Sequence, residues 1–222
     1  MDKKICVFGQ YESASSIIFL QKAASHFYEQ GYKVYWPLLT QCMYLQDYIV
    51  SPARFIEIEE GPLPFTADIE FDFQNAPDFY PEFRKMEAKY KLIDLDFSDW
   101  QKYFEFQRNP VREQALFDKL ELEGKKYTLV NSNFGTPPDI QTKEVYTEGN
   151  NLIVNVSFID GFSAFDWGKV FEEADQISIV ESSFAFIAEK WETKATKMFL
   201  TPLGPDASQV DYLFNNNWEY KF

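Results

Sequence analysis

Ser182 and Ser183 are the residues whose types and setting point most directly to chemistry. They follow a short apolar run, 177–180, and precede a segment with helical periodicity, 184–191. This order predicts a strand, a turn and a helix. Hydroxyl groups and unpaired backbone N–H groups at the start of a helix suit a diphosphate, but simple helix capping explains the same serines. Glu181, just before them, would repel a phosphate unless it faces a ribose or an acceptor.

A second polar loop, with Asn131, Asn133 and Gly135, follows the apolar run 127–130. In an open parallel sheet, ligands bind outside the carboxyl ends of the strands, so a loop in this position is a candidate for a binding site. The amide side chains can hydrogen-bond a sugar or a phosphate. Asn and Gly are also common in ordinary turns, and the sequence leaves both interpretations open.

The loop after the first predicted strand contains Gln10, Tyr11, Glu12 and Ser13. It has neither the Gly-x-Gly-x-x-Gly pattern of dinucleotide-binding proteins nor the lysine of a phosphate-binding P-loop. Ser13 can cap the following helix or present a hydroxyl to an anion. Glu12 is placed where a general base would face a bound acceptor, although its charge also suits the start of a helix.

The single histidine, His26, and the two cysteines, Cys6 and Cys42, exclude several kinds of site. We expect His26 on the surface, away from the apolar stripe of its helix, which argues against a Ser-His-Asp triad. The cysteines lack the spacing of metal ligands. They are too few for a disulfide scaffold and indicate a reducing compartment.

The composition is that of a folded protein with an acidic surface. Of the 222 residues, 45% are hydrophobic and 18% aromatic, and the formal net charge is −14. This charge disfavours binding to a phosphate backbone, although it leaves room for a local basic groove. No apolar run is long enough to span a membrane. The first residues show no signal-peptide pattern, so we expect a mature chain that works in the cytoplasm.

Two series of predicted strands and helices position the candidate loops. The first has a strand, a helix and a strand at 4–8, 17–30 and 33–36, the pattern of a parallel sheet with a right-handed crossover. The second has strands at 127–130, 151–158, 176–180 and 197–200, and helices at 166–173 and 184–191. A mostly helical segment, 81–122, separates them. We therefore expect an α/β fold that divides near residue 105.

Several motifs of the second half occur in a familiar order. They are Arg112-Glu113, Tyr127-Thr128-Leu129-Val130-Asn131, Phe165-Asp166-Trp167, Glu172-Glu173-Ala174-Asp175-Gln176-Ile177 and Val180-Glu181-Ser182-Ser183-Phe184. This order resembles the donor-binding half of GT-B glycosyltransferase-like proteins, including heptosyltransferase-like and fucosyltransferase-like members of bacteria and viruses. In those families a Ser-Ser-Phe or Asp-Ser-Gly element at a strand end contacts the donor diphosphate. The first half, with Trp36-Pro37-Leu38, resembles the acceptor half of the same fold.

The resemblance implies two small Rossmann-like halves whose parallel sheets face one another across a cleft. Residues 1–105 would form the acceptor-side half, and residues 106–222 the donor-side half with a docked aromatic tail. The activity implied is transfer of a sugar from a nucleotide-sugar to a hydroxyl-bearing acceptor. The nucleotide-sugar would be a co-substrate, and neither a cofactor nor a metal would be needed.

The resemblance and the candidate loops together give each site residue an expected role. Glu12 would be the catalytic base, and Gln10, Tyr11 and Ser13 would bind the acceptor. The donor would be bound by Asn131, Asn133, Gly135, Glu181, Ser182 and Ser183.

Two features set the chain apart from that family. GT-B enzymes are usually longer, and the basic residues expected near the donor loops are few: Lys143, Lys169 and Lys190. A leaving diphosphate needs positive charge or helix ends to neutralise it. The alternatives are therefore a non-catalytic GT-B-derived binding or interaction protein, and a viral glycosyltransferase that acts on modified DNA bases. Nucleic acid is the less favoured partner because of the net charge of −14.

Overall fold

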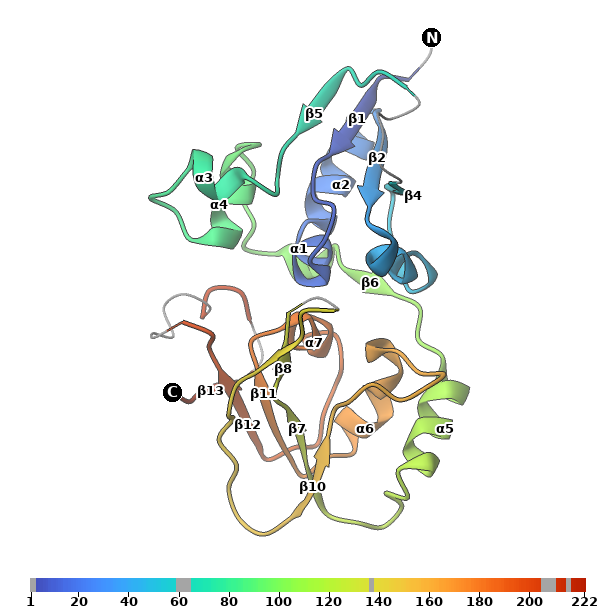
Figure 1. Ribbon diagram of the computed structural model, residues 1–222, viewed down its shortest axis with the longest axis vertical. Helices are drawn as coiled ribbons and strands as arrows, with labels where there is room; N and C mark the ends of the chain where they lie inside the picture. The colour runs from blue at the N-terminus through green and yellow to red at the C-terminus, as the bar shows by residue number, and fades with distance from the viewer. Residues whose placement is uncertain (1–2, 59–64, 136–137, 205–210, 215–216) are drawn as a thin grey trace. The chain divides into compact units, whose positions relative to one another are not determined.

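The computed structural model describes residues 3–58, 65–135, 138–204, 211–214 and 217–222. The chain divides into two compact units, Met1–Gln107 and Arg108–Phe222; Figure 1 colours the chain from blue at its start to red at its end. The boundary expected from the sequence lay near residue 105. The assignment of an acceptor to one unit and a donor to the other stays a prediction.

A four-stranded parallel sheet forms the centre of the first unit, in the order β4-β2-β1-β5. The strands are β1 (Ile5–Phe8), β2 (Lys33–Leu38), β4 (Arg54–Glu57) and β5 (Ile69–Phe71), and β1 is followed by the helices α1 (Ala14–Phe19) and α2 (Gln21–Glu29). The predicted strand–helix–strand pattern is confirmed. The two helices carry the chain back to the end of the sheet at which β1 begins, so β2 runs parallel to β1 and pairs with it.

The helix predicted over 17–30 is two helices that meet at Leu20, where φ is −82° and ψ is 7°. Ile17, Ala24 and Phe27 are buried, as the periodicity indicates, but Tyr28 is 50% exposed. Successive helical residues are turned by about 100°. Since Phe27 faces the core, its neighbour Tyr28 is carried round to the solvent.

The segment 81–122 is much less helical than its sequence suggests. It contains only the short elements α4 (Lys85–Lys91), η2 (Trp100–Lys102), β6 (Glu105–Phe106) and α5 (Pro110–Lys119). Asp94 has a φ of 50°, which a continuing helix does not allow. Beyond it, Trp100 and Phe104 are fully buried, so the irregular chain is held by aromatic packing rather than by helical hydrogen bonds.

The remaining elements of the first unit are small. They are η1 (Thr40–Asp47), β3 (Ile49–Val50), which pairs antiparallel with β6, and α3 (Ala76–Phe79). The 3-10 helix η1 ends at Asp47 and is followed directly by the strand β3.

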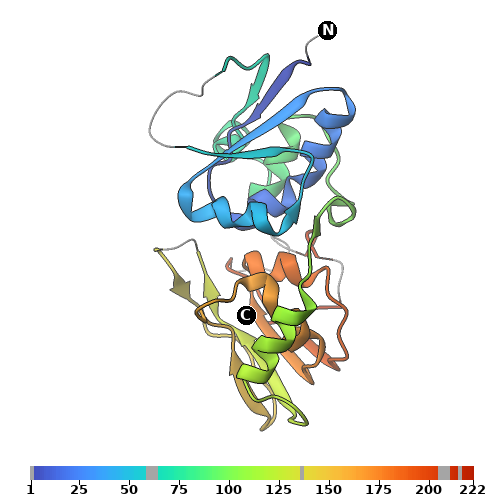
Figure 2. The same cartoon turned by 90° about the vertical axis from the view of Figure 1, so that its right-hand side faces the viewer.

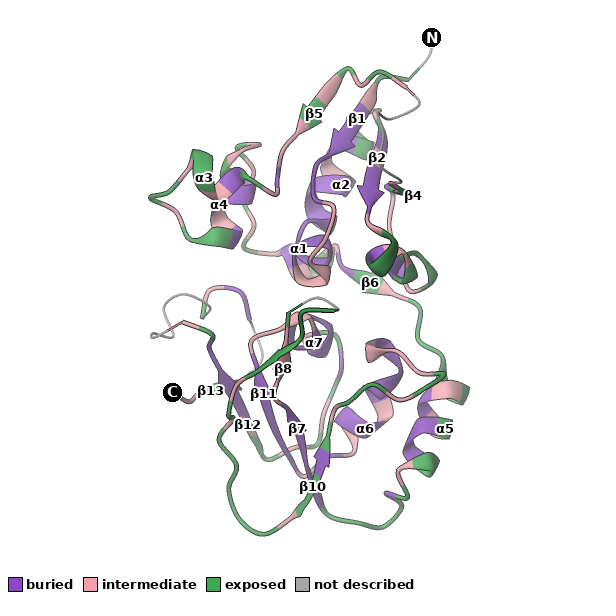
Figure 3. Ribbon diagram, in the orientation of Figure 1, coloured by how far each residue is buried: buried purple, intermediate pink, exposed green. Residues whose placement is uncertain are grey.

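A five-stranded parallel sheet forms the centre of the second unit, in the order β10-β7-β11-β12-β13. Its strands are β7 (Tyr127–Asn131), β10 (Leu152–Asn155), β11 (Gln176–Val180), β12 (Lys197–Thr201) and β13 (Glu219–Tyr220). The central strands β7 and β11 are buried along their whole length, as Figure 3 shows in purple. Near-continuous apolar runs are typical of such strands, which is why the sequence located them correctly.

Helices and a small hairpin complete the second unit. They are α5, η3 (Ala164–Trp167), α6 (Gly168–Glu172), α7 (Ser183–Ala188), and the antiparallel pair β8 (Asn133–Phe134) and β9 (Gln141–Thr142). The helix α5 contacts η3 and α6, and Figure 2 shows it in front of the sheet. Parallel sheets with helices in both units make the chain an α/β protein, as predicted.

The described part of the tail packs on the second unit. The Phe214 ring lies 5.1 Å from that of Phe186, and Trp218 Nε1 donates to Glu189 Oε1 at 2.8 Å. The strand β13 adds to the sheet beside β12. Phe222, at the end, is 72% exposed.

Candidate functional site

The carboxyl ends of β7 and β11 bring two of the predicted donor residues together. Asn131 is the last residue of β7, is 3% exposed, and pairs with Ile179 of β11. Its Nδ2 donates to Ser182 Oγ at 3.0 Å. This hydrogen bond joins the two loops that the sequence predicted separately. We call these two loops the donor loops: Asn131, Asn133, Gly135, Glu181, Ser182 and Ser183.

Ser182 does not cap α7 through its side chain. It occupies the N-cap position with extended backbone angles, but the structure has no side-chain cap hydrogen bond there. Its hydroxyl oxygen instead accepts from Asn131. The capping interpretation of this serine is therefore wrong, and its hydroxyl is tied to the neighbouring strand end. Ser183, the first residue of α7, is partly exposed.

Glu181 turns toward the loop after β12. Its Oε2 accepts from the backbone N–H of Leu203 at 2.9 Å, and its own N–H donates to Thr201 O at 2.9 Å. The Nζ of Lys143 donates to Pro202 O in the same loop, at 2.6 Å. The carboxylate and the lysine therefore both brace this loop.

Asn133 and Gly135 shape the chain that follows Asn131. The Nδ2 of Asn133 donates to Val156 O at 3.1 Å. Gly135 has a φ of 97°, and a Cβ there would lie 2.5 Å from the Asp139 carbonyl oxygen. These residues fix the form of the loop, and the turn interpretation holds for Gly135.

Replacing Gly135 by alanine should destabilise the second unit by about 1–3 kcal/mol, because both the positive φ and the contact with Asp139 must be relieved. Urea unfolding of the purified variant measures this. Gly149→Ala is a matched control, since Gly149 has a φ of 78° but a Cβ added there would meet no atom within 4 Å. Equal losses for the two variants would show that the contact with Asp139 has no effect.

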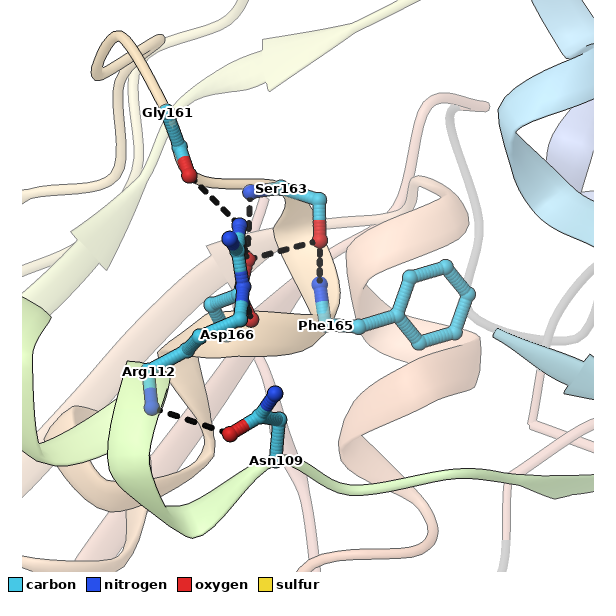
Figure 4. Close-up of polar contacts among 6 residues, drawn as sticks. All are labelled: Asn109, Arg112, Gly161, Ser163, Phe165 and Asp166. Atoms are coloured by element: carbon cyan, nitrogen blue, oxygen red, sulfur yellow. Dashed lines mark hydrogen bonds and ion pairs between the residues drawn. The ribbon is translucent and has the colours of Figure 1, made fainter. Parts of the chain in front are cut away.

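The arginines of the second unit are held in internal ion pairs. Figure 4 shows Arg112, whose Nε and Nη2 donate to the two carboxylate oxygens of Asp166 at 2.9 and 2.8 Å. Arg108 forms a similar pair with Glu113 and also contacts Glu172. Neither guanidinium is available to bind a diphosphate without breaking these contacts.

Asp166 is the buried partner in this network. Burial acts to raise its pKa, but the hydrogen bonds from Arg112 and Ser163 outweigh burial and hold the pKa below its usual value. Ser163 and Asp166 also form a capping box at the start of η3. Within the described residues, Asp166 of the Phe165-Asp166-Trp167 motif therefore has a structural role.

Lys169 was expected near the donor loops, and this is wrong. Its Nζ lies 5.0 Å from the centroid of the Phe117 ring, and it lines a pocket with Lys126 and Tyr127 at the start of β7. This pocket lies at the amino-terminal ends of the strands, whereas the donor loops lie at their carboxyl ends. The prediction was wrong because α6 comes just before β11 and therefore lies near the amino-terminal end of that strand. The donor loops and α7 come after β11, at its carboxyl end.

Gln10 is a buried residue whose side-chain amide is engaged at both ends. It is 3% exposed. Its Oε1 accepts from Lys89 Nζ at 2.5 Å, and its Nε2 donates to the carbonyl oxygen of Glu12 at 2.7 Å. Gln10 therefore shapes the loop between β1 and α1, in which Glu12 lies half-buried.

Ser13 is strained and does not cap α1. Its φ is 71°, which is rare for a residue other than glycine, and its side chain makes no cap hydrogen bond. Its Oγ lies 3.1 Å from Ser15 Oγ and 3.2 Å from Ser16 Oγ. The capping interpretation is wrong here too, and the hydroxyls form a cluster of their own.

Tyr11 lies in the same loop and is held through its backbone. Its N–H donates to Gln74 Oε1 at 3.3 Å, and its carbonyl oxygen accepts from the Leu39 N–H at 2.9 Å. Burial together with Glu70 and Asp72 raises the pKa of its phenol. The phenol is therefore a neutral hydrogen-bonding group near pH 7.

Lys89 is a candidate that the sequence reasoning missed. It is 1% exposed, and besides Gln10 it donates to Phe73 O at 2.7 Å. Burial and the neighbouring Lys85 lower the pKa of its ammonium to about 7, against the influence of Asp72. The signal was present: Lys89 lies three residues after Met86 on α4, on the face that Met86 buries.

The comparisons with known proteins bear on the fold. No protein-family model matches the chain, and no curated protein gives a significant match. Among solved structures, the crystal structure of a glycosyl transferase family 9 protein from Veillonella parvula DSM 2008 is similar. The match has a TM-score of 0.54 and 7% identity, and covers 90% of this chain and 80% of the other.

The fold is GT-B-like. This similarity and the two parallel sheets confirm the predicted α/β, GT-B-like fold class. The prediction that the two sheets face one another across a cleft stays a prediction. At 7% identity the similarity shows the fold alone, so the heptosyltransferase-like or fucosyltransferase-like subfamily stays a prediction.

The described residues of this GT-B-like chain form no group of three or more His, Cys, Asp or Glu that could hold a metal ion. Cys6 and Cys42 are free and buried, and burial raises the pKa of the Cys6 thiol to about 12. His26 is partly buried and hydrogen-bonds Gln30. Within the described part of the chain, no helix has the length and apolar character needed to cross a membrane.

Proposed function

We propose that the chain is a glycosyltransferase that moves a sugar from a nucleotide-sugar to a hydroxyl-bearing acceptor. The observation that carries the proposal is the Asn131–Ser182 hydrogen bond, because it joins the carboxyl ends of two adjacent parallel strands. Ligands of open α/β sheets bind at such strand ends. The similarity to a glycosyl transferase family 9 structure supports the same activity.

In this proposal the donor loops bind the nucleotide-sugar. The Ser182 and Ser183 hydroxyls hydrogen-bond the diphosphate or the sugar. The buried Asn131 amide contributes to the donor site by holding the Ser182 hydroxyl in place. Glu181 faces the ribose or the acceptor rather than a phosphate, since its Oε2 is drawn to the Leu203 N–H. Lys143, which braces the loop after β12, supplies positive charge for the leaving group.

Glu12 is the proposed base. Within the described residues its carboxylate forms no hydrogen bond or ion pair, while its backbone carbonyl oxygen accepts a hydrogen bond from Gln10. The acceptor oxygen would bond to the anomeric carbon as the bond from that carbon to the diphosphate oxygen breaks. The acceptor proton would pass to Glu12, and the nucleoside diphosphate would leave. Tyr11 and Ser13 are the proposed acceptor contacts, and Gln10 contributes to acceptor binding by fixing the loop that carries them.

Replacing Asn131 by alanine should weaken nucleotide-sugar binding by about tenfold, since the Ser182 hydroxyl is no longer oriented toward the ligand. Isothermal titration calorimetry with the nucleotide-sugar that binds best measures this. Asn155→Ala is the matched control, because Asn155 is exposed on the neighbouring strand β10. Equal affinities of the Asn131→Ala variant and the parent protein would exclude Asn131 from the site.

Replacing Glu12 by glutamine should lower kcat by about 10²–10⁴-fold, the usual contribution of a general base. The donor affinity should stay unchanged. A steady-state assay of nucleoside diphosphate release measures the rate. A Glu12→Gln variant with full activity would remove the base assignment while leaving donor binding untouched.

A non-catalytic GT-B-derived binding protein is the second candidate. The internal pairing of Arg108 and Arg112 favours it, because these guanidinium groups are not free to neutralise a leaving diphosphate. Nucleotide-sugar binding without any transfer or hydrolysis would identify this case. In both cases we propose a cytoplasmic location, which the two free cysteines support.

A further inference from the structure

A pocket of about 360 Å³ lies in the second unit, at the amino-terminal ends of β7 and β11. Lys125, Lys126, Lys169 and Lys194 line it. In Figure 1 this end of the sheet is at the bottom, whereas α7 begins near the top of the same unit. The pocket is therefore separate from the donor loops, and the proposed function leaves it unused. We call it the lysine pocket.

The charge of the lysine pocket is opposite in sign to that of the whole chain. The chain carries a formal net charge of −14, but the pocket lining has four lysines and three carboxylates, Glu123, Glu173 and Asp175. Two of these carboxylates are already engaged. Glu173 pairs with Lys194 at 2.6 Å, and Asp175 Oδ2 accepts from the Tyr127 N–H at 3.0 Å.

Three of the pocket lysines keep their charge available. Within the described part of the chain, no ion pair is formed by Lys125, Lys126 or Lys169. Lys169 instead lies over the Phe117 ring, with 5.0 Å from Nζ to the centroid, a contact that orients an ammonium without neutralising it. The pocket lining therefore includes three lysines whose charge is not neutralised by an ion pair within the described residues.

The backbone that carries these lysines is fixed. Gly124 makes a turn with a φ of 69°, and the Lys125 N–H donates to Leu122 O at 3.0 Å. The hydroxyl of buried Tyr127 donates to Val170 O at 2.7 Å and so ties the start of β7 to α6, which carries Lys169. Tyr127 thus ties the loop that carries Lys125 and Lys126 to the helix that carries Lys169.

We infer that the lysine pocket binds a small phosphate-bearing anion. Lysine ammonium groups bind phosphate as point charges, and a volume of about 360 Å³ is that of a small-molecule site. A nucleic acid fits less well, because it would need basic charge spread over an extended surface. The inference is independent of the proposed glycosyl transfer.

Inorganic pyrophosphate titrated into the full chain by isothermal titration calorimetry tests the site. The parent protein should bind it at low salt, and binding should weaken as sodium chloride is added. The Lys125→Gln/Lys126→Gln variant should bind at least about fivefold more weakly, since two ammonium groups are lost. Lys169→Gln should act in the same direction.

Two controls separate this site from others. Lys4→Gln/Lys33→Gln makes the same charge change at exposed lysines of the first unit and should leave pyrophosphate binding unchanged. Asn131→Ala reports on pyrophosphate bound at the donor loops, because only binding at that second place should weaken in this variant. Thermal melts establish that each variant is folded, which the exposure of Lys125 and Lys126 favours.

The outcomes are distinct. Weakening confined to the pocket variants supports the inference. Pyrophosphate binding that is absent, unaffected by the pocket variants, or lost only in Asn131→Ala overturns it. Failure of every nucleotide-sugar to bind would instead count against the proposed function and would leave this result as it stands.

Discussion

The free energy of unfolding should rise by roughly 1.5–2 kcal/mol between pH 7 and pH 8.5, and the Lys89→Met variant should lose this rise. In the unfolded chain a lysine holds its proton up to a pH near 10.5, but burial lowers the pKa of folded Lys89 to about 7. Between these values the unfolded state binds more protons. Stability therefore increases with pH in this window, and the penalty of burying the charge is fully present below pH 7.

The upper limit of the window comes from other buried groups. The pKa of the Cys6 thiol is about 12 in the folded protein, compared with 9.0 for an unperturbed thiol. Above about pH 8.5 the unfolded state loses protons from thiols that the folded state keeps, which opposes the Lys89 effect. Measurements between pH 7 and pH 8.5 isolate Lys89.

Urea unfolding at half-unit steps of pH measures the slope. Lys91→Met is the matched control, because Lys91 is exposed on the same helix, α4, and the variant should keep the slope of the parent protein. A flat profile for the parent, or an unchanged slope in Lys89→Met, would show that Lys89 is charged in both states throughout this range.

Replacing Arg112 by methionine should cost about 3–5 kcal/mol of stability, since it leaves the Asp166 carboxylate buried without its charged partner. The Asp166 side chain is 1% exposed, while that of Arg112 is 39% exposed. The loss should shrink as the pH falls, because Asp166 can then take up a proton. A double variant, Arg112→Met with Asp166→Leu, should recover much of the loss, as paired replacement by apolar residues removes the uncompensated charge.

The exposed pair of Arg84 and Glu87 provides the comparison. Their side chains are 40% and 27% exposed and are separated by 3.0 Å, so Arg84→Met should cost less than about 1 kcal/mol. Urea unfolding of the parent protein, the two single variants Arg112→Met and Arg84→Met, and the double variant measures these losses. A loss for Arg112→Met as small as that for Arg84→Met would mean that solvent reaches Asp166 easily.

The strands that carry the candidate site were predictable because they are buried on both faces. The run 176–180 is apolar apart from its polar first residue and Ser178, and all of β11 is buried. Amphipathic periodicity also identified the buried face of α2. It could not show that the chain bends at Leu20 or that the helix α4 ends at Lys91, since those features depend on tertiary packing.

The site was predictable residue by residue but not as an arrangement. Asn131 and Ser182 were both named because each follows a strand, yet their hydrogen bond depends on the register of β7 against β11. The position of Lys89 beside Met86 indicated that Lys89 is buried, but its partners, Gln10 and Phe73, come from other parts of the chain and could not be predicted. Arg112 gave no sign of its ion pair, since Asp166 is 54 residues away.

Titration of the full chain with a panel of uridine-, guanosine- and adenosine-diphosphate sugars by calorimetry tests the central claim, that the donor loops bind a nucleotide-sugar. We expect at least one member to bind with a Kd within about 1 μM–1 mM, and the Asn131→Ala variant to weaken that binding while Asn155→Ala does not. No binding across the whole panel, or binding unaffected by Asn131→Ala, would contradict the claim.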